Sequence, residues 1–219
     1  MILVGIADSG IDGPAAASVR ARADFSDQGS SASENTMRDG ARHGSAIGAV
    51  IAAIDGVALL DARIFDARLR AGTAQAAAAI DWLVARGARI LNLSFGMRED
   101  DRLLREACHR ALEAGVLIVA SVPARGEPVF PGSYPGVIRA TGDARCTDGA
   151  ISWLGTAQAD AGGAPRTPCG RVAGASAGCA HVSAALAHLM VQCPEAGRQA
   201  LLEALRASAR HHGPERRLS

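Results

Sequence analysis

Gly-Ala-Ser-Ala-Gly-Cys-Ala-His-Val, residues 174–182, is a run of small residues that opens directly into an apolar helix. A serine at the start of a helix is ordinarily an N-cap, and that interpretation of Ser176 stays open. Gly174, however, lets the backbone approach another group closely, and the small side chains leave room for a substrate carbonyl. The N–H groups of the helix start would face an oxyanion. The pattern therefore indicates a nucleophile, which needs a base and an acid from elsewhere in the chain.

The composition predicts an α/β protein. The chain has 219 residues, enough for a substantial core, and we expect one domain over residues 1–219. Hydrophobic residues make up 48% and aromatic residues only 3%, so alanine and the aliphatic side chains must form that core. The formal net charge of +1 gives no support to bulk attraction to nucleic acid or to a membrane surface.

The cysteines and the first residues bear on location. Five cysteines, without a Cys-x-x-Cys pair or zinc-like spacing, predict reduced thiols, and we expect no metal site and no cofactor. Cys179 lies close to Ser176, where we expect a small buried packing residue rather than a nucleophile. The apolar run at residues 2–7 lacks a basic flank and is too short for a signal peptide, and no stretch approaches a membrane span. These features predict a cytoplasmic protein.

Short apolar runs alternate with helical patterns along the chain. We expect strands at residues 2–7, 57–65, 90–96, 116–120 and 137–141, and helices at 43–53, 73–86, 102–114, 176–191 and 194–209. Residues 14–42 are expected to be loop, residues 142–170 irregular, and about 210–219 a flexible tail. The alternation predicts a three-layer fold, in which a mostly parallel sheet carries helices on both faces.

Four polar positions lie where such a sheet would carry its site. Asp8 follows the first expected strand, and the polar tip at residues 94–96 ends the third. His43 and Ser176 each begin an expected helix. In open parallel sheets, ligands bind outside the carboxyl ends of the strands. We therefore expect these positions to meet at one edge of the sheet.

Three motifs occur in an order that one enzyme family shares: Ala7-Asp8-Ser9-Gly10-Ile11-Asp12, His43-Gly44-Ser45 and Gly174-Ala175-Ser176. From residue 2 to about residue 192 the chain resembles the subtilisin-like serine peptidases, whose acid, base and nucleophile occur in the order Asp, His, Ser. The resemblance implies that family's three-layer fold, with Ser176 as nucleophile, His43 as general base and Asp8 orienting the imidazole. Taken alone, Asp8 would fit a turn-forming aspartate as well.

The resemblance also implies where a substrate binds. The family adds an extended peptide as a strand to the enzyme's edge, a role that falls here to Ser94, Phe95 and Gly96. Phe95 would line a pocket, although a place in the hydrophobic core suits it equally. His181, in the helix after Ser176, is expected to be structural. The expected partner is a peptide or protein substrate.

The chain departs from the family pattern in the loop after residues 116–120. There the family carries an asparagine whose amide donates to the oxyanion, and the alignment places Ala124 at that position. In subtilisin itself, loss of this donor costs about 10²–10³ in rate. The expected replacement is Ser121, Arg125 or a loop backbone N–H, with the N–H of Ser176 as its partner.

These features favour an enzyme with one dedicated precursor. Low intrinsic activity in the cytoplasm, with no recognisable pro-segment or calcium loop, suits a processing protease that removes a leader peptide. Two alternatives remain open: a catalytically weak or inactive peptide-binding homologue, and a peptide cyclase or ligase that passes the acyl group to an amine. The presence of all three triad residues favours the hydrolytic enzyme.

Overall fold

The computed structural model of the protein describes residues 1–26, 39–66, 68–147 and 149–215. In this part of the chain, nine strands form one sheet in the order β2-β3-β1-β4-β5-β6-β8-β7-β9. Neighbouring strands are parallel except for β7 and β8. The strands are β1 Ile2–Asp8, β2 Val19–Asp24, β3 Val57–Arg63, β4 Ile90–Leu93, β5 Leu117–Ser121, β6 Ile138–Gly142, β7 Ser152–Trp153, β8 Ala161–Gly163 and β9 His211–His212.

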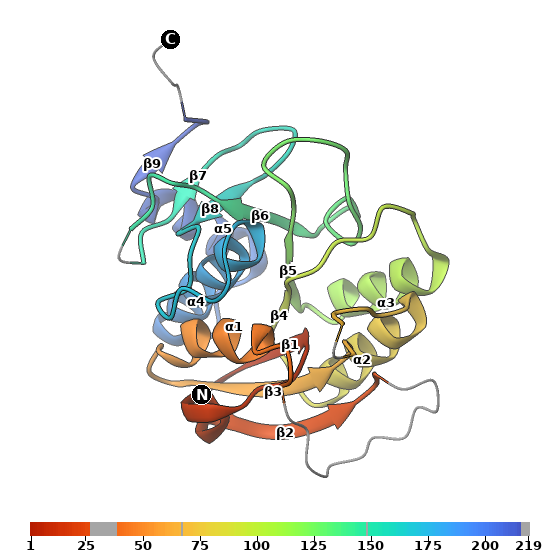
Figure 1. Ribbon diagram of the computed structural model, residues 1–219. Helices are drawn as coiled ribbons and strands as arrows, with labels where there is room; N and C mark the ends of the chain where they lie inside the picture. The colour runs from red at the N-terminus through yellow and green to blue at the C-terminus, as the bar shows by residue number, and fades with distance from the viewer. Residues whose placement is uncertain (27–38, 67, 148, 216–219) are drawn as a thin grey trace.

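Helices cover both faces of this sheet (Figure 1). α1 and α4 pack on one face, with α5 against α4, while α2 and α3 pack together on the other. Each face carries its own apolar cluster, so the prediction of a three-layer α/β fold is confirmed. No described helix combines the length and apolar character needed to cross a bilayer. The α-helices are α1 His43–Ala52, α2 Thr73–Ala85, α3 Arg102–Glu113, α4 Ala175–Gln192 and α5 Arg198–Ser208.

The central strands bring two of the candidate residues to one edge. β1, β4 and β5 lie side by side in the middle of the sheet and are buried on both faces, which explains their nearly continuous apolar sequences. β1 ends at the buried Asp8, and Ser94 follows directly after β4. Because β1 and β4 are parallel neighbours, both residues lie at the same edge of the sheet.

The prediction of loop over residues 14–42 is wrong in part. Gly13–Ser18 form a 3-10 helix, η1, and Val19–Asp24 form β2 at the edge of the sheet beside β3. An edge strand needs no continuous apolar run. In β2, Arg20 is exposed and Arg22 is half-buried. Residues 27–38 of this segment lie outside the described part of the chain.

The structure differs from two predictions near the C-terminus. Residues 142–170 contain the short strands β7 and β8, and the expected tail begins with β9, which pairs with β7. The backbone N–H groups of Arg210 and Gly213 donate to the carbonyl oxygens of Ile151 and Trp153, at 2.8 and 2.9 Å. Such short strands are held by backbone pairing, which leaves no periodicity in the side chains.

Two glycines allow helices to lie close against the candidate site. A Cβ atom on Gly44 in α1 would overlap the carbonyl oxygen of Gly10, which follows β1. A Cβ atom on Gly178 in α4 would overlap the carbonyl oxygen of Thr141 in β6. The starts of α1 and α4 therefore reach the sheet only because these two positions lack a side chain.

Candidate active site

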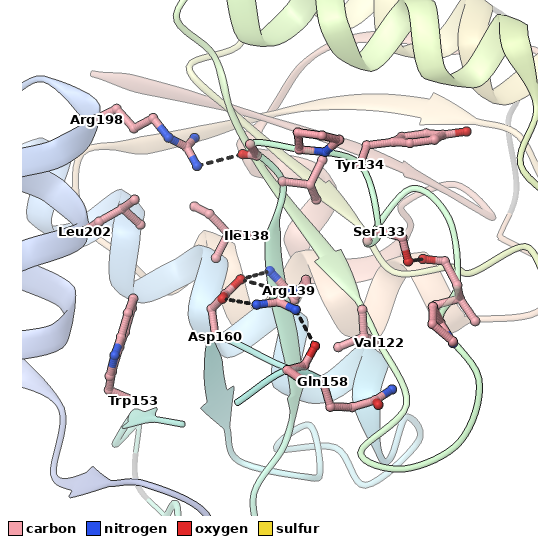
Figure 2. Close-up of a pocket in the computed structure, with 17 residues that line it drawn as sticks. Val122, Ser133, Tyr134, Ile138, Arg139, Trp153, Gln158, Asp160, Arg198 and Leu202 are labelled. Carbon is pink, nitrogen blue, oxygen red and sulfur yellow. Dashed lines mark hydrogen bonds and ion pairs between the residues drawn. The ribbon is translucent and has the colours of Figure 1, made fainter. Parts of the chain in front are cut away.

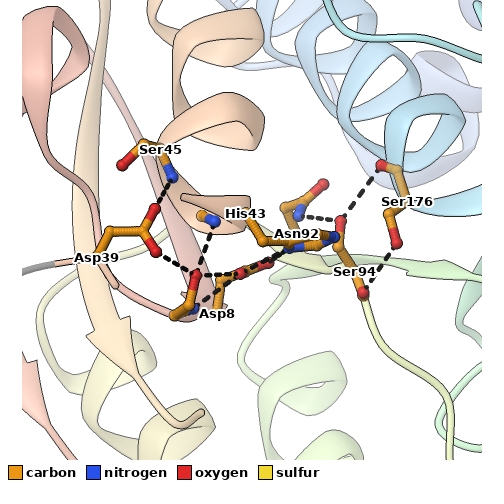
Figure 3. A network of polar contacts seen from close by, with 9 residues as sticks. Asp8, Asp39, His43, Ser45, Asn92, Ser94 and Ser176 are labelled. Atoms are coloured by element: carbon orange, nitrogen blue, oxygen red, sulfur yellow. Dashed lines mark hydrogen bonds and ion pairs between the residues drawn. The ribbon is translucent and has the colours of Figure 1, made fainter. Parts of the chain in front are cut away.

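Asp8 and His43 form a hydrogen-bonded pair at the carboxyl end of β1 (Figure 3). Nδ1 of His43 lies 2.8 Å from Oδ1 and 2.9 Å from Oδ2 of Asp8, whose side chain is fully buried. A carboxylate at this position favours a proton on Nδ1, which leaves Nε2 of the neutral ring as an acceptor. The pair therefore has the geometry of a general base oriented by an acid.

A second carboxylate, Asp39, connects this pair to the first turn of α1. The Ser9 hydroxyl lies 2.7 Å from Oδ1 of Asp39 and 3.2 Å from Oδ1 of Asp8, and it accepts the backbone N–H of Gly44 at 2.9 Å. Oδ2 of Asp39 accepts the N–H of Ser45 at 2.8 Å. Nothing in the residue pattern distinguishes Asp39 from an ordinary turn aspartate in a glycine-containing loop, so sequence reasoning missed it.

The surroundings of His43 raise its pKa. Burial lowers the pKa, but the hydrogen bond with Asp8 and the negative charges of Asp8 and Asp39 outweigh that effect, so the pKa lies above the ordinary value of 6.5. A higher pKa makes the imidazole a stronger base toward a hydroxyl proton. It also means that the ring becomes neutral, and able to act as a base, only at a higher pH.

Ser176 is the second residue of α4 and faces the same sheet edge (Figure 3). Its hydroxyl donates to the carbonyl oxygen of Ser94 at 3.1 Å, and among the described contacts no hydrogen bond joins it to His43. The structure therefore brings Asp8 to His43 and Ser176 to Ser94, while the hydroxyl–imidazole hydrogen bond of a triad is not among the described contacts. Catalytic hydrogen bonds often form fully only when substrate is bound.

Asn92 is a fully buried amide in β4 that supports this arrangement. Its Nδ2 donates to the Ser94 hydroxyl at 2.8 Å, and its Oδ1 accepts from the Ser183 hydroxyl of α4 at 2.9 Å. In the sequence, Asn92 is recognisable as an amide within an apolar strand. A buried polar group of this kind is expected to be hydrogen-bonded, so the pattern predicts a partner for it. Asn92 therefore ties β4 to α4 and fixes Ser94 beside Ser176.

Cys179 and His181 follow Ser176 in α4. Cys179 is fully buried, and burial raises the pKa of its thiol to about 12, so the prediction of a packing residue is confirmed. Nε2 of His181 lies 3.2 Å from the carbonyl oxygen of Arg166, a contact that suits the predicted structural role. Within the described residues, no three His, Cys, Asp or Glu side chains converge as metal ligands.

The candidate substrate residues divide between core and surface. Phe95 is 8% exposed and packs edge-on against Phe65, with ring centroids 6.1 Å apart, so the core alternative describes its ring. Ser94 is also buried, whereas Gly96 is exposed. A Cβ atom on Gly96 would lie only 2.9 Å from Cγ2 of Val129, which closes one side of this position. Gly96 is therefore the most exposed residue of this segment.

The three residues considered for the oxyanion hole differ in exposure. Ser121 ends β5 and is buried, whereas Ala124 and Arg125 are exposed in the loop that follows. Ala124 and Arg125 line a cavity of about 510 Å³ whose wall includes Pro165. The carbonyl oxygen of Pro165 accepts the N–H of Gly174 at 2.8 Å. The loop therefore borders a cavity whose wall is hydrogen-bonded to Gly174, the residue before α4.

The fold has three layers, and the carboxyl edge of its sheet carries an Asp–His pair and a serine at the start of a helix. This is the arrangement of a subtilisin-like peptidase. The model of the Subtilase family, peptidase S8, matches residues 1–218, and the chain belongs to this family. Sphericase has a similar structure, with a TM-score of 0.71 and 18% identity over 94% of this chain and 82% of that chain.

Two further proteins resemble the chain. Fervidolysin from Fervidobacterium pennivorans, a keratinolytic enzyme related to subtilisin, has a TM-score of 0.67 and 22% identity over 90% of this chain and 37% of that chain. The minor extracellular protease Epr of Bacillus subtilis (strain 168) is 39% identical over 62 residues, 27% of this chain. That match spans only 10% of Epr, so the activity of this chain has to be argued from its own residues.

Proposed function

We propose that the protein is a serine endopeptidase in which Ser176 is the nucleophile, His43 the general base and Asp8 the residue that orients the imidazole. The observation that carries the proposal is the buried carboxylate of Asp8 on Nδ1 of His43, which leaves Nε2 to take a proton. Membership of the Subtilase family supports the same assignment.

The reaction begins when the Ser176 hydroxyl turns from the Ser94 carbonyl oxygen towards Nε2 of His43. His43 takes the hydroxyl proton as Oγ attacks the scissile carbonyl carbon, and Asp8 stabilises the imidazolium. The imidazolium gives this proton to the leaving amine as the C–N bond breaks, and an acyl-enzyme remains. Water, deprotonated by His43, hydrolyses the ester and restores Ser176.

The oxyanion of each tetrahedral intermediate needs donors near α4. The first N–H groups of a helix lack intrahelical acceptors, so the N–H of Ser176 supplies one donor. We assign the second to the loop after β5, through Ser121, Arg125 or a backbone N–H. Because Ala124 offers no side-chain donor, we expect slower turnover than in family members that carry the asparagine.

The proposed substrate is an extended peptide that pairs with the backbone at residues 94–96. We propose a dedicated role in the cytoplasm, the removal of a leader peptide from one precursor, and the five unpaired cysteines support a reducing compartment. Our candidate precursor is the small subunit of a quinohemoprotein amine dehydrogenase. The basis is the resemblance of the sequence to the subtilisin-like protease that matures that enzyme.

A peptide-binding role without turnover is the second candidate. Two observations favour it: the Ser176 hydroxyl is bonded to the Ser94 carbonyl oxygen, and Ala124 replaces the oxyanion asparagine. A binding scaffold, however, has no use for a carboxylate buried against His43, because burial of a charge is costly unless the charge is paired. The Asp8–His43 pair therefore favours the enzyme.

Covalent labelling tests the nucleophile directly. We expect a fluorophosphonate probe to label the wild-type chain, with mass spectrometry placing the adduct on Ser176. Ser176→Ala should abolish labelling, whereas Ser208→Ala, at an exposed position on α5, should leave it unchanged. A folded wild-type chain that takes no label, or takes it elsewhere, would reject the catalytic assignment in favour of the binding role.

A trapping experiment tests the substrate. Ser176→Ala used as bait should retain an uncut precursor, which wild-type protein would release as a shortened product. The product mass separates hydrolysis, which adds one water to each cleaved bond, from cyclisation or ligation, which does not. Incubation with the leader-containing amine dehydrogenase subunit tests that precursor, and a subunit of unchanged length would reject it.

A further inference from the structure

A cavity of about 290 Å³ lies along β2, the outermost strand on its side of the sheet (Figure 1). It is lined by Val19, Arg20, Ala21 and Arg22 of β2 and by Arg86, which follows α2. Successive side chains of a strand point to opposite faces of the sheet. A cavity that touches four consecutive residues therefore runs along the edge of β2, and it is the outer edge, because β3 pairs with the inner one.

The backbone at this edge is open to a partner. The ladder with β3 shifts register between Val19 and Ala21, so the regular part of the outer edge is residues 21–24. No hydrogen bond from another described segment reaches the backbone of residues 20–23 on the outer side. Such an edge is a template for another extended chain. A second copy of β2 would place arginine against arginine, and like charges oppose that pairing.

Two of the three arginines that line the cavity are exposed and form no ion pair with a described carboxylate. Nη2 of Arg20 lies 3.8 Å from Sδ of Met1, which is a weak acceptor. Arg86 lies over the ring of Trp82, with Cζ 5.0 Å from the ring centroid. This contact uses the face of the guanidinium and leaves the N–H groups around its rim for other partners.

The other charged side chains of β2 are paired. Nε of Arg22 lies 4.0 Å from Oδ2 of the buried Asp61, and Asp24 accepts from Nη1 of Arg63 at 3.3 Å. The charge that β2 itself offers to a partner is therefore the positive charge of Arg20.

A cavity of about 580 Å³ beside β6 and α5 shows the contrasting case (Figure 2). There Arg139 and Asp160 form a bidentate pair, with Nε 3.1 Å from Oδ2 and Nη2 2.6 Å from Oδ1. The charges of that pair balance each other within the protein, whereas the two exposed arginines at the edge of β2 have no such counterpart.

We propose that the outer edge of β2 binds an extended acidic peptide of a partner protein, which adds to the sheet as a further strand and places carboxylates on Arg20 and Arg86. Backbone pairing supplies affinity for an extended chain, and carboxylate–guanidinium contacts select an acidic one. A compact anion would reach the arginines but leave the edge unpaired. A neutral peptide would pair with the edge but make no ionic contact.

Three probe peptides separate charge from backbone pairing. They are tested on Ser176→Ala, which lacks the proposed nucleophile, so that the peptides stay intact. In fluorescence anisotropy, labelled Glu-Val-Glu-Val-Glu-Val should bind in a saturable way. The same peptide with glutamine in place of glutamate should bind at least about tenfold more weakly, because it lacks the charges. A glutamate peptide N-methylated at every residue keeps the charges but cannot donate to the edge, and it should lose at least about tenfold as well.

Matched variants and hydrogen exchange locate the site. Arg20→Gln and Arg86→Gln should each weaken binding of the glutamate peptide about threefold, and together about tenfold. Arg206→Gln removes the same charge from an exposed position on α5 and should leave binding unchanged. The bound peptide should slow amide exchange at residues 21–24 more than at residues 94–96, which distinguishes this edge from the proposed substrate strand.

Four results would overturn the proposal: equal binding of the glutamate and glutamine peptides, full binding of the N-methylated peptide, unchanged binding by the double variant, or protection confined to residues 94–96. A single-stranded oligonucleotide that binds more tightly than the glutamate peptide, and displaces it, would assign the surface to nucleic acid instead. The peptide comparisons need no change in β2, so they decide the matter even if an arginine variant fails to fold. None of these measurements uses the Ser176 hydroxyl, and their outcome is independent of the proposed peptidase activity.

Discussion

Asp8 has no exposed surface, and its carboxylate is hydrogen-bonded to Nδ1 of His43. Its Oδ1 accepts the N–H of Ser9 at 2.7 Å, and both of its oxygens lie within 2.9 Å of the imidazole Nδ1. Donors of this kind satisfy the oxygens of a carboxylate that water cannot reach. At the scale of single residues, the proposed chemistry therefore depends on a carboxylate whose hydrogen bonds are formed before any substrate binds.

Replacement of Asp8 by asparagine tests that charge. Asp8→Asn keeps the shape of the side chain, but its amide favours the wrong imidazole tautomer, so we expect the rate of peptide hydrolysis or of fluorophosphonate labelling to fall about 10⁴-fold, as in the chymotrypsin-type triad. Asp55→Asn, at an exposed turn, should leave the rate unchanged. An Asp8→Asn variant with wild-type rate would contradict the orienting role.

The pH dependence of labelling tests Asp39 as a positioning residue. Burial lowers the pKa of His43, but the bond with Asp8 and the charges of Asp8 and Asp39 raise it above 6.5, so the acid limb of the rate profile should have its midpoint above that value. Asp39→Asn removes one of these charges. We expect the midpoint to move to lower pH, with activity kept further into acid. A midpoint that stays in place or rises would show that Asp39 does not act on His43.

At the scale of elements, the sequence predicts best what is buried on both faces. β1, β4 and β5 follow their apolar runs closely, and α2 and α3 follow their helical periodicity. β2 and the short strands β7 to β9 lie in the outer part of the sheet and depend on backbone pairing, which no side-chain pattern records.

The candidate site shows the same division between local and long-range information. Asp8, His43 and Ser176 lie in short motifs, so the sequence alone singles them out. Asp39 and Asn92 act through contacts between segments that are distant in the chain, 30 residues for Asp39 with Ser9 and 91 for Asn92 with Ser183. Such contacts become visible only when the topology is known.

The packing of α4 on β6 gives a prediction at this scale. A Cβ atom on Gly178 would overlap the carbonyl oxygen of Thr141, so Gly178→Ala must push the start of α4 away from the sheet and displace Ser176. We expect a loss of about 1–3 kcal/mol in the free energy of unfolding, together with loss of labelling. Gly197→Ala, where an added Cβ meets open space, is the control for chemical denaturation. Equal stability of the two variants would contradict the close approach.

A buried acid in β3 gives a second prediction. Oδ2 of Asp61 accepts the N–H of Ile11 at 3.0 Å, and Oδ1 is buried with no hydrogen-bond partner in the described part of the chain. Burial raises the pKa of Asp61 to about 7 against the lowering effect of Arg22. Because the folded pKa exceeds the unfolded value, the stability contributed by the neutral acid is full below the unfolded pKa of 3.8 and is lost progressively as the pH rises to about 7.

Asp61→Asn cannot ionise and should escape this loss. Between about pH 6 and pH 9 we expect the wild-type chain to lose about 1.4 kcal/mol more unfolding free energy than the variant, measured by urea denaturation. Asp55→Asn should follow the wild-type curve. Parallel curves for wild type and Asp61→Asn would show that the carboxyl group already titrates normally in the folded state.

At the scale of the whole molecule, the sheet lies between two apolar clusters, and the proposed nucleophile and base come from the two helices on the same face (Figure 1). β1 and β4, which end at the site, are central strands, whereas β2 and β9 are the outermost strands. Opening of the edges therefore does not require movement of the strands that hold Asp8 and Ser94.

Hydrogen exchange measures this difference across the molecule. Amides of β1, β4 and β5 are buried and paired on both sides, so they should exchange only through global unfolding, whereas those of β2 and β9 should exchange through local opening at least about tenfold faster. The first turn of α1 should group with the centre, because Asp39 and Ser9 bond its N–H groups. Fast exchange in β1 with slow exchange in β2 would mean that the edge of the sheet is more stable than its centre. The proposed acid and base would then lack the rigid support that their geometry requires.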